Sequence, residues 1–248
     1  MKKINWKVIA AVTTAVLLVL VAGFVFWASD ASAATDTALQ ALNSDAQVNV
    51  SQENGWITFS PSETSQPETG FIFYPGGKVD FRAYAPLLKM IAAKGYFVVV
   101  VPAPLNLAFF DINAAARVEA AYPEITNWFV GGHSLGGVAA SSYAGSHKEI
   151  RGVVFWASYP ADDALKVNNI PAVSIFGTKD GLATSDKLDA SKALLLPDTQ
   201  FIAIEGGNHA QFGSYGPQAG DNESTISPEE QWTQAANATV AFFTDVLK

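Results

Sequence analysis

The 248-residue sequence contains no cysteine and only three histidines. Without cysteine the chain forms no disulfide, no thiolate metal site and no covalent intermediate on sulfur, so any nucleophile must be oxygen or nitrogen. The sequence also lacks a histidine pair at metal-binding spacing, a phosphate-binding loop and a dinucleotide-binding fingerprint. We therefore expect neither a metal nor a nucleotide cofactor.

Basic residues are few. The chain has 15 Lys and Arg against 23 Asp and Glu, a formal net charge of -8, and its body holds no basic cluster. Nucleic acids are bound by clustered Lys and Arg, so we expect no nucleic-acid partner. Apolar residues make up 49% of the chain, which is enough for a sizeable core, and the length favours one large domain.

Residues 1–33 differ from the rest of the chain. Three lysines within the first seven residues precede Val8–Ala28, a stretch without charge. A cleaved signal peptide has an apolar region of about 7–15 residues and a small-x-small exit, which Ala31-Ser32-Ala33 supplies. About 20 apolar residues span a bilayer, and Trp27 stands at the expected interface. The length favours an uncleaved, single-pass anchor with the C-terminal domain extracytoplasmic, whereas cleavage after Ala33 would give a secreted protein.

Residues 34–68 are polar and are expected to hold a linker followed by a hairpin. The candidate linker is Ala34–Asp45, which is rich in small and polar residues. Val48–Val50 and Trp56–Phe59 alternate in polarity on either side of Asn54-Gly55. An Asn-Gly pair between two such runs predicts a β-hairpin with a two-residue turn.

Residues 69–248 alternate between short apolar runs and segments of helical period. The predicted strands are Phe71–Tyr74, Tyr96–Val101, Trp128–Gly131, Gly152–Ala157, Ala172–Phe176 and Phe201–Ile204. The predicted helices are Phe81–Lys94, Ile112–Ala121, Leu135–His147, Ser185–Leu195 and Pro228–Leu247. Continuous apolar strands alternating with helices predict an α/β fold, a doubly wound, mostly parallel sheet with helices on both faces. Only residues 158–171 separate the fourth and fifth of these strands, which leaves little room for a lid.

A serine lies at the centre of a glycine-flanked turn in this pattern. Gly132-His133-Ser134-Leu135-Gly136 fits G-x-S-x-G, with a predicted strand before it and a predicted helix after it. In that context the serine sits on a sharp strand-to-helix turn that exposes its hydroxyl. Ser134 is therefore the candidate nucleophile.

A serine hydroxyl needs a base, and the three histidines make its assignment nearly one of elimination. His133 adjoins Ser134 and should point away from its hydroxyl, and His147 lies near the far end of the following helix. Both are expected to be structural or surface residues. His209 directly follows the last predicted strand, where a loop carries it over the carboxyl edge of the sheet, so His209 is the candidate base.

The base in turn needs a carboxylate, and two backbone N–H groups must face the developing oxyanion. Asp180 follows the penultimate strand, with Asp162 or Asp163 as the alternative, and Ser-Asp-His is the chain order of the α/β-hydrolases. The first N–H is that of Leu135, just after the serine. The second belongs to the loop after the first of these strands, where Gly77 is favoured and Lys78 is the close alternative.

With these residues in place, the chain from about Thr69 onward resembles the α/β-hydrolase superfamily, and more narrowly its small, lid-poor, dienelactone hydrolase-like branch. The stretches that carry the resemblance are FYPGGKVDFRAYAPLLKMIAAKGYFVVVVPAPLNLAFF, GGHSLGGVAASSYA, IFGTKDG and IEGGNHAQFGSYGPQAGD. The resemblance implies a triad of Ser134, Asp180 and His209, no cofactor and ester-type substrates. Dienelactone hydrolases use a cysteine nucleophile, so lactone specificity is not implied here.

The expected function is that of a serine hydrolase of carboxylic esters, acting on a small-molecule ester outside the cytoplasm and held at the membrane by its N-terminal helix. Two alternatives use the same chain: an acyltransferase or thioesterase with the same triad, and a catalytically silent, membrane-tethered binding module. Phe109, Phe110, Phe212 and Tyr215 are candidates for the lining of an acyl pocket. Lys78 and Arg82 are candidates for meeting a substrate carboxylate but are expected to be solvated.

Overall fold

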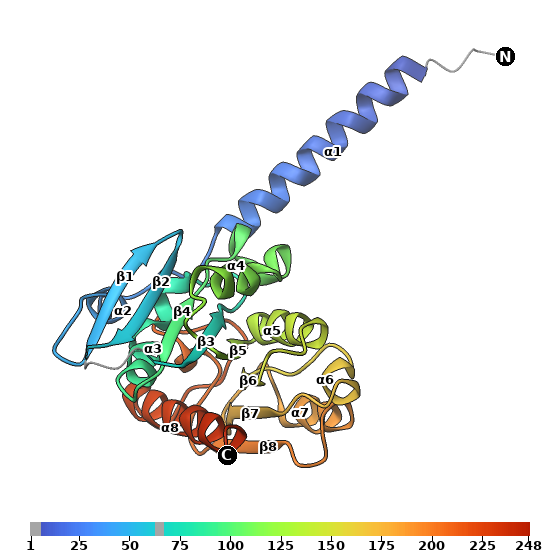
Figure 1. Ribbon diagram of the computed structural model, residues 1–248. Coiled ribbons are helices and arrows are strands. Elements are labelled where there is room, and N and C mark those ends of the chain that lie inside the picture. Colours follow the sequence, from blue (N-terminus) through green and yellow to red (C-terminus); the bar gives the residue numbers. More distant parts are fainter. Residues whose placement is uncertain (1–5, 63–66) are drawn as a thin grey trace.

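The protein is built around one eight-stranded sheet (Figure 1), and its computed structural model describes residues 6–62 and 67–248. The strand order is β1-β2-β4-β3-β5-β6-β7-β8. The strands from β4 to β8 in this order pair in parallel, while β1 and β2 pair antiparallel. This confirms the doubly wound, mostly parallel sheet. The strands are β1 Val48–Glu53, β2 Trp56–Pro61, β3 Thr69–Tyr74, β4 Phe97–Val100, β5 Asn127–His133, β6 Gly152–Trp156, β7 Ala172–Gly177 and β8 Gln200–Ile204.

The N-terminal hairpin is confirmed and extends the main sheet. Glu53 pairs with Trp56 across a two-residue turn, in which Asn54 and Gly55 have φ of 55° and 87°. Both values are positive, as a type I′ turn requires. β2 then pairs antiparallel with β4, so the hairpin forms the edge of the same sheet. Within the preceding polar stretch, α2 (Asp36–Ala41) is capped by Thr35, whose hydroxyl accepts the N–H of Ala38.

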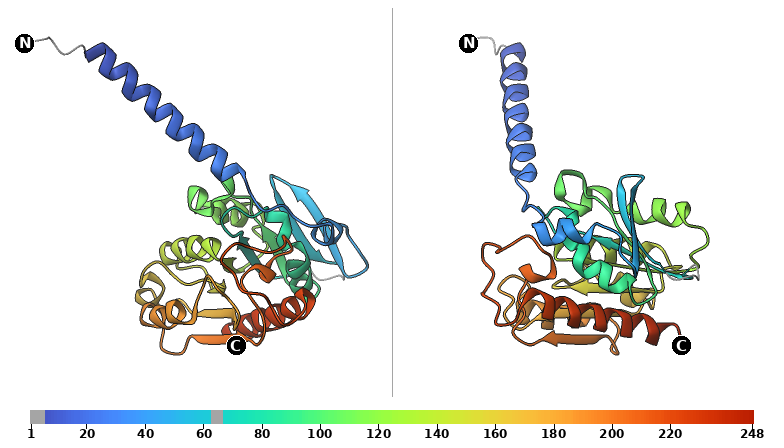
Figure 2. Two further views of the ribbon diagram at one scale, coloured as in Figure 1. Left: turned by 180° about the vertical axis from the view of Figure 1, so that it is seen from behind. Right: turned by 90° about the vertical axis from the view of Figure 1, so that its left-hand side faces the viewer.

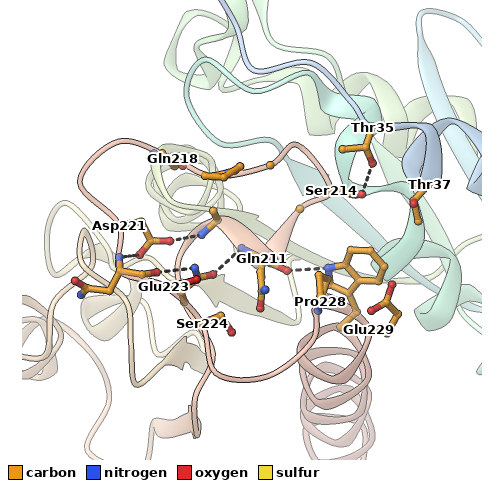
Figure 3. Close-up of a pocket in the computed structure, with 17 residues that line it drawn as sticks. Thr35, Thr37, Gln211, Ser214, Gln218, Asp221, Glu223, Ser224, Pro228 and Glu229 are labelled. Carbon is orange, nitrogen blue, oxygen red and sulfur yellow. Dashed lines mark hydrogen bonds between the residues drawn. The ribbon is translucent and has the colours of Figure 1, made fainter.

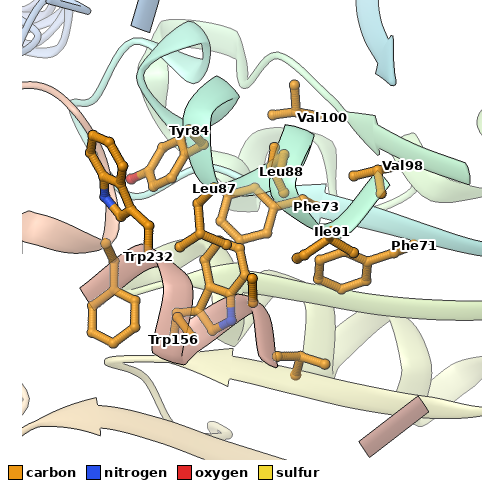
Figure 4. Packing of buried hydrophobic residues seen from close by; sticks show 14 of the residues in the cluster. Phe71, Phe73, Tyr84, Leu87, Leu88, Ile91, Val98, Val100, Trp156 and Trp232 are labelled. Atoms are coloured by element: carbon orange, nitrogen blue, oxygen red, sulfur yellow. The ribbon is translucent and has the colours of Figure 1, made fainter. Parts of the chain in front are cut away.

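Helices cover both faces of the sheet. Strand residues alternate between the two faces, so Phe71 and Phe73 face one core and Ile72 faces the other. The first core also contains side chains of α3 (Ala85–Ala92) and α8 (Pro228–Val246), and Figure 4 shows Leu87, Leu88 and Ile91 packed between sheet and helices. The second core contains side chains of α4 (Ala114–Ala121), α5 (Leu135–Ser146) and α6 (Ala164–Val167).

Two predicted helices are shorter than expected. The segment predicted as Phe81–Lys94 begins as a 3₁₀ turn, Phe81–Tyr84, and α3 starts only at Ala85. Pro86 lacks an N–H and is accommodated in the first turn of a helix rather than its interior, which sets this boundary. The segment predicted as Ser185–Leu195 is α7 (Ser185–Ser191) followed by a 3₁₀ turn, Lys192–Leu194.

The N-terminal helix α1 (Trp6–Ser29) projects from the domain (Figures 1 and 2). Of its residues only Ala28 is buried, so its apolar side chains are exposed. Its 24 residues span about 36 Å at 1.5 Å per residue, more than the roughly 30 Å of a bilayer's hydrocarbon core. Within the described ranges it is the one helix long and apolar enough to cross a membrane or to act as a signal sequence. Lys2 and Lys3, two of the three lysines that precede the apolar stretch, lie outside the described residues.

The chain reverses its direction of winding at β3. β4 lies on one side of β3 and β5 on the other, which makes the space between β3 and β5 a topological switch point. In open α/β sheets, ligands bind at the carboxyl ends of the strands at such a point. The loops after β3, β5, β7 and β8 all leave this edge, and they carry Gly77, Ser134, Asp180 and His209 respectively.

Candidate active site

Ser134 occupies a strained turn between β5 and α5. Its φ of 51° and ψ of -122° are unusual for a residue with a side chain, and such strain persists only where the surroundings hold it. The N–H of Ser134 donates to the carbonyl of Trp156 at 3.0 Å. The carbonyl of Ser134 accepts the hydroxyl of Ser158 at 2.6 Å. These bonds tie the turn to the end of β6, as expected for a serine that is held with its hydroxyl exposed.

The two glycines of the G-x-S-x-G pattern permit this turn by close approach. A Cβ on Gly132 would lie 2.3 Å from the carbonyl carbon of Gly136, and a Cβ on Gly136 would lie 2.1 Å from the carbonyl oxygen of Tyr74. Both contacts are with backbone, which has no room to move away. The pattern predicted from the sequence therefore has a steric cause in the packing of α5 against β5 and the end of β3.

His209 and Asp180 form a buried, hydrogen-bonded pair. His209 Nδ1 lies 2.9 Å from Asp180 Oδ2, and the two side chains are 2% and 1% exposed. The other oxygen, Oδ1, accepts the N–H groups of Leu182 and Ala183, each at 2.7 Å. A carboxylate that is fixed on both oxygens holds the imidazole in one orientation. It also holds the tautomer with its proton on Nδ1, which leaves Nε2 as the basic nitrogen.

The basic nitrogen of His209 lies beside the same pocket as Ser134. Nε2 is buried and has no hydrogen-bond partner among the described residues, and Ser134 Oγ does not bond to it in this structure. The pocket has a volume of about 210 Å³. It is lined by Ser134, Leu135, Val138, Ala157, Ser158, Tyr159, Leu182, Ala183 and His209. The structure thus brings together all three predicted members of the triad, and the predicted alternatives Asp162 and Asp163 are exposed and outside this pocket.

Two backbone N–H groups are available beside Ser134. Leu135 is the first residue of α5, so its N–H has no acceptor within the helix. Gly77 lies next to it, since a Cβ on Gly77 would be 3.1 Å from Leu135 Cδ2. Neither N–H donates to another described residue. The N–H of Lys78, the alternative, donates to the carbonyl of Asn106 at 2.8 Å, so the geometry favours Gly77.

His133 is buried behind the site. The N–H of Gly76 donates to the hydroxyl of Tyr84 at 3.0 Å, and that hydroxyl is hydrogen-bonded to His133 Nδ1 at 2.8 Å. Burial, together with the imidazole of His209, lowers the pKa of His133 well below its usual 6.5. His133 is therefore a neutral structural residue, which joins the turn around Ser134 to the loop that carries Gly77. His147 contacts the carbonyl of Tyr143 at 2.8 Å, away from the pocket.

The residues expected to contact substrate lie elsewhere. Phe212 and Tyr215 are buried in the core, with Phe212 stacked on His133, while Phe109 and Phe110 are exposed. None of these four candidates lines the pocket beside Ser134, whose aromatic lining residue is Tyr159. Among the cationic candidates, Arg82 pairs with Asp80, and Lys78 Nζ lies 4.7 Å from the ring centre of Trp27.

Asp221 links the loops that carry Asp180 and His209, and the sequence did not indicate this. Its Oδ2 accepts the N–H of Ala210 at 2.8 Å, and its Oδ1 accepts the N–H groups of Gly181 and Asn222 at 3.0 Å and 2.9 Å. One carboxylate thereby joins the residue after His209 to the residue after Asp180. The signal in the sequence is an acidic residue twelve positions after His209, which has no meaning until the loops are placed.

The same loop is also held from α8 and borders a second pocket. Gln231 accepts the N–H of Asn208 at 3.0 Å and donates to its carbonyl at 2.7 Å, which fixes the residue before His209. The second pocket is larger, about 680 Å³, and Asp221 and Trp232 are among its lining residues (Figure 3). It contains neither Ser134 nor His209, so size alone does not identify the reactive site.

Comparisons with known proteins agree with this architecture. The sequence pattern that defines the alpha/beta hydrolase family matches residues 70–233. No curated protein matches the chain. The esterase domain of a Rhodothermus marinus protein is structurally similar, with a TM-score of 0.59 at 14% identity, covering 79% of this chain and 96% of that one. A protein assigned as a dienelactone hydrolase from Klebsiella pneumoniae has a TM-score of 0.60 at 14% identity, and the match covers 79% of this chain and 97% of that one. Est1E from Butyrivibrio proteoclasticus has a TM-score of 0.55 at 12% identity, and the match covers 81% of this chain and 99% of Est1E. The match over residues 70–233 shows that this chain belongs to the alpha/beta hydrolase family.

Proposed function

We propose that the chain is a serine hydrolase that cleaves small carboxylic esters through Ser134, His209 and Asp180, with the catalytic domain outside the cytoplasm. The observation that carries this proposal is the arrangement of His209. Its Nδ1 is bonded to a buried carboxylate, and it lines the same pocket as a strained, glycine-flanked serine. The names of the structural neighbours, which include esterases, support the choice of ester substrates.

The reaction begins with the transfer of the Ser134 hydroxyl proton to His209 Nε2. Ser134 Oγ bonds to the ester carbonyl carbon, and the carbonyl oxygen takes the negative charge within reach of the Leu135 and Gly77 N–H groups. When the C–O bond to the alcohol breaks, the alcohol leaves with the proton from His209. Water then gives its proton to His209 and attacks the acyl carbon. The bond to Ser134 Oγ breaks, the acid departs, and the proton returns to Ser134.

The extracytoplasmic location rests on the N-terminal segment. Exposed apolar residues on α1 favour lipid rather than water, and the lysines before it favour the cytoplasmic side. The domain that follows α1 then lies across the membrane from those lysines.

The proposal is tested by ester hydrolysis with the full-length protein in detergent. Ser134→Ala and His209→Ala should each lower kcat for p-nitrophenyl butyrate by roughly 10⁴–10⁶-fold, because the residues of a triad act as a unit. Ser142→Ala is the matched control, since this serine lies on α5 with its hydroxyl bonded to the Val138 carbonyl. Circular dichroism confirms that each variant is folded. A folded Ser134→Ala protein with unchanged kcat contradicts the proposal and favours a binding module.

A further inference from the structure

A short apolar segment lies beside the domain end of α1. Residues 104–111, here called the aromatic segment, form two 3₁₀ turns, Pro104–Asn106 and Ala108–Asp111. Outside α1, only four large apolar side chains of the described residues are exposed, namely Leu39, Phe109, Phe110 and Val167. Phe109 and Phe110 are 47% and 49% exposed, and their ring centres lie 4.5 Å apart. They form the one exposed aromatic pair among the residues described outside α1.

The aromatic segment is fixed to α1 by two contacts. The ring centres of Phe110 and Phe24 are 6.1 Å apart in an edge-on arrangement. The side chain of Asn106 donates to the carbonyl of Ala28 at 3.1 Å. Figures 1 and 2 show this green part of the chain at the base of α1. The pair therefore lies beside the helix at a definite height along its axis.

That height corresponds to the interior of a bilayer. The apolar span of α1 ends at Ala28, and Phe24 lies four residues before it, about 6 Å further along the helix at 1.5 Å per residue. If Val8–Ala28 crosses the hydrocarbon, Phe110 reaches the same depth as Phe24. Apolar faces of interfacial segments are buried about 5–10 Å into the membrane boundary, which agrees with this depth.

The composition of the segment supports lipid as its partner. Residues 101–110 carry no charge, and the first charged residue after them, Asp111, is paired with Arg117. Lys78, beside Trp27 and 3.8 Å from Asp30, lies at the level where headgroups are expected. The aromatic pair thus adjoins the apolar surface of α1. The nearby charged residues, Asp30, Lys78 and Asp111, lie between this surface and the rest of the domain.

From this arrangement we propose that the aromatic segment is a second membrane contact, with Phe109 and Phe110 inserted into the bilayer beside α1. This inference rests on the membrane attachment in the proposed function. The segment is also joined to the candidate oxyanion loop, since the carbonyl of Asn106 accepts the Lys78 N–H and Leu107 borders Gly77. Membrane contact therefore holds the loop beside Ser134 next to the lipid surface and limits rotation of the domain about α1.

The absence of cysteine permits a direct test with single labels. The full-length variants Phe110→Cys, Val19→Cys and Val167→Cys each receive an environment-sensitive fluorophore and are reconstituted into phosphatidylcholine–phosphatidylglycerol vesicles. Val19 lies within α1, and Val167 is the control because its side chain is 72% exposed and lies on α6. We expect lipids spin-labelled near the headgroup to quench position 110 several-fold more than position 167. Lipids labelled near the chain end should quench position 19 most.

The other outcomes separate the possible failures. If position 19 is quenched but position 110 is quenched as weakly as position 167, α1 is inserted and the second contact is wrong. If neither position 19 nor position 110 is quenched, the membrane attachment fails, and the inference fails with it. A blue-shifted but unquenched label at position 110, with a shift that depends on protein concentration, means that a second copy of the chain covers the pair and also overturns the inference.

Discussion

Asp221→Asn should separate the positioning of His209 from the folding of the domain. The wild-type carboxylate accepts three backbone N–H groups, one each from Ala210, Gly181 and Asn222. Asparagine keeps one acceptor oxygen and places an NH₂ group where the other oxygen was. Either the Ala210 or the Gly181 N–H then faces a donor, and the link between the two catalytic loops is broken on that side.

The size of the effect follows from these bonds. A hydrogen bond to a charged group contributes about 1.5–3 kcal/mol, and we take about 2 kcal/mol because Asp221 is partly exposed. For a chain of this length, about 2 kcal/mol lowers Tm by roughly 4–8 °C. A displacement of the catalytic group by about 1 Å costs on the order of 10²-fold in rate. We therefore expect kcat to fall by roughly 10–100-fold, less than the about 10⁴-fold expected for Asp180→Asn.

The assay is kcat and KM for p-nitrophenyl butyrate at 25 °C, with Tm measured on the same samples. Glu223→Gln is the matched control. Glu223 lies two residues after Asp221, and its exposed carboxylate bridges neither loop, so the variant removes the same charge without breaking the link. A positioning role predicts a fall in kcat with little change in KM, while the control stays at wild-type values. If Tm falls while kcat is unchanged, Asp221 stabilises the fold without orienting His209, and the reasoning is refuted.

Three further results are expected. Tyr84→Phe removes the buried hydroxyl between Gly76 and His133 and leaves the Gly76 N–H and His133 Nδ1 unpaired. The free energy of unfolding, measured with denaturant, should therefore fall by about 1–3 kcal/mol. An unchanged midpoint would show that this bridge contributes nothing to stability. The pKa of His133 is depressed on folding, so as pH falls below 6.5 the unfolded state binds a proton that the folded state does not, and stability falls by up to about 1.4 kcal/mol per pH unit. His133→Gln should remove this part of the slope, and identical slopes for the two proteins would be inconsistent with it. The pocket of about 210 Å³ is smaller than the usual range of about 300–1,000 Å³ for ligand sites, so p-nitrophenyl acetate and butyrate should be preferred to longer esters. Leu182→Ala should enlarge the pocket and shift the optimum to longer acyl chains. A wild-type preference for long chains would exclude this pocket as the acyl site.

The sequence predicted the parts of this molecule that depend on local pattern. The strands β3 to β7 are short, mostly apolar runs that are buried on both faces, as such runs are in parallel sheets, while the edge strand β8 is only partly buried. Ser134, Asp180 and His209 follow the ends of three of these strands. Parallel strands bring such positions to one edge, which is why the sequence suffices to expect them close together.

Features that depend on contacts between distant segments were not predictable. Asp221 acts only because the loops after β7 and β8 lie side by side, and no local pattern in its surroundings indicates this. Phe109 and Phe110 follow β4 and were candidates for the pocket, but Phe110 contacts Phe24 of α1 and Phe109 packs against Phe110. The pairing of β2 with β4 likewise depends on the whole sheet, since a hairpin on its own specifies only its own register.

The most direct test of the central claim is mass-spectrometric mapping of a fluorophosphonate adduct on the full-length protein. An activated serine forms the adduct, whereas an ordinary surface serine does not. The account predicts one adduct, on the peptide that contains Ser134, and its loss in Ser134→Ala and His209→Ala but not in Ser142→Ala. No adduct on a folded wild-type protein, or an adduct that persists in His209→Ala at the wild-type rate, would contradict the proposed roles of Ser134 and His209.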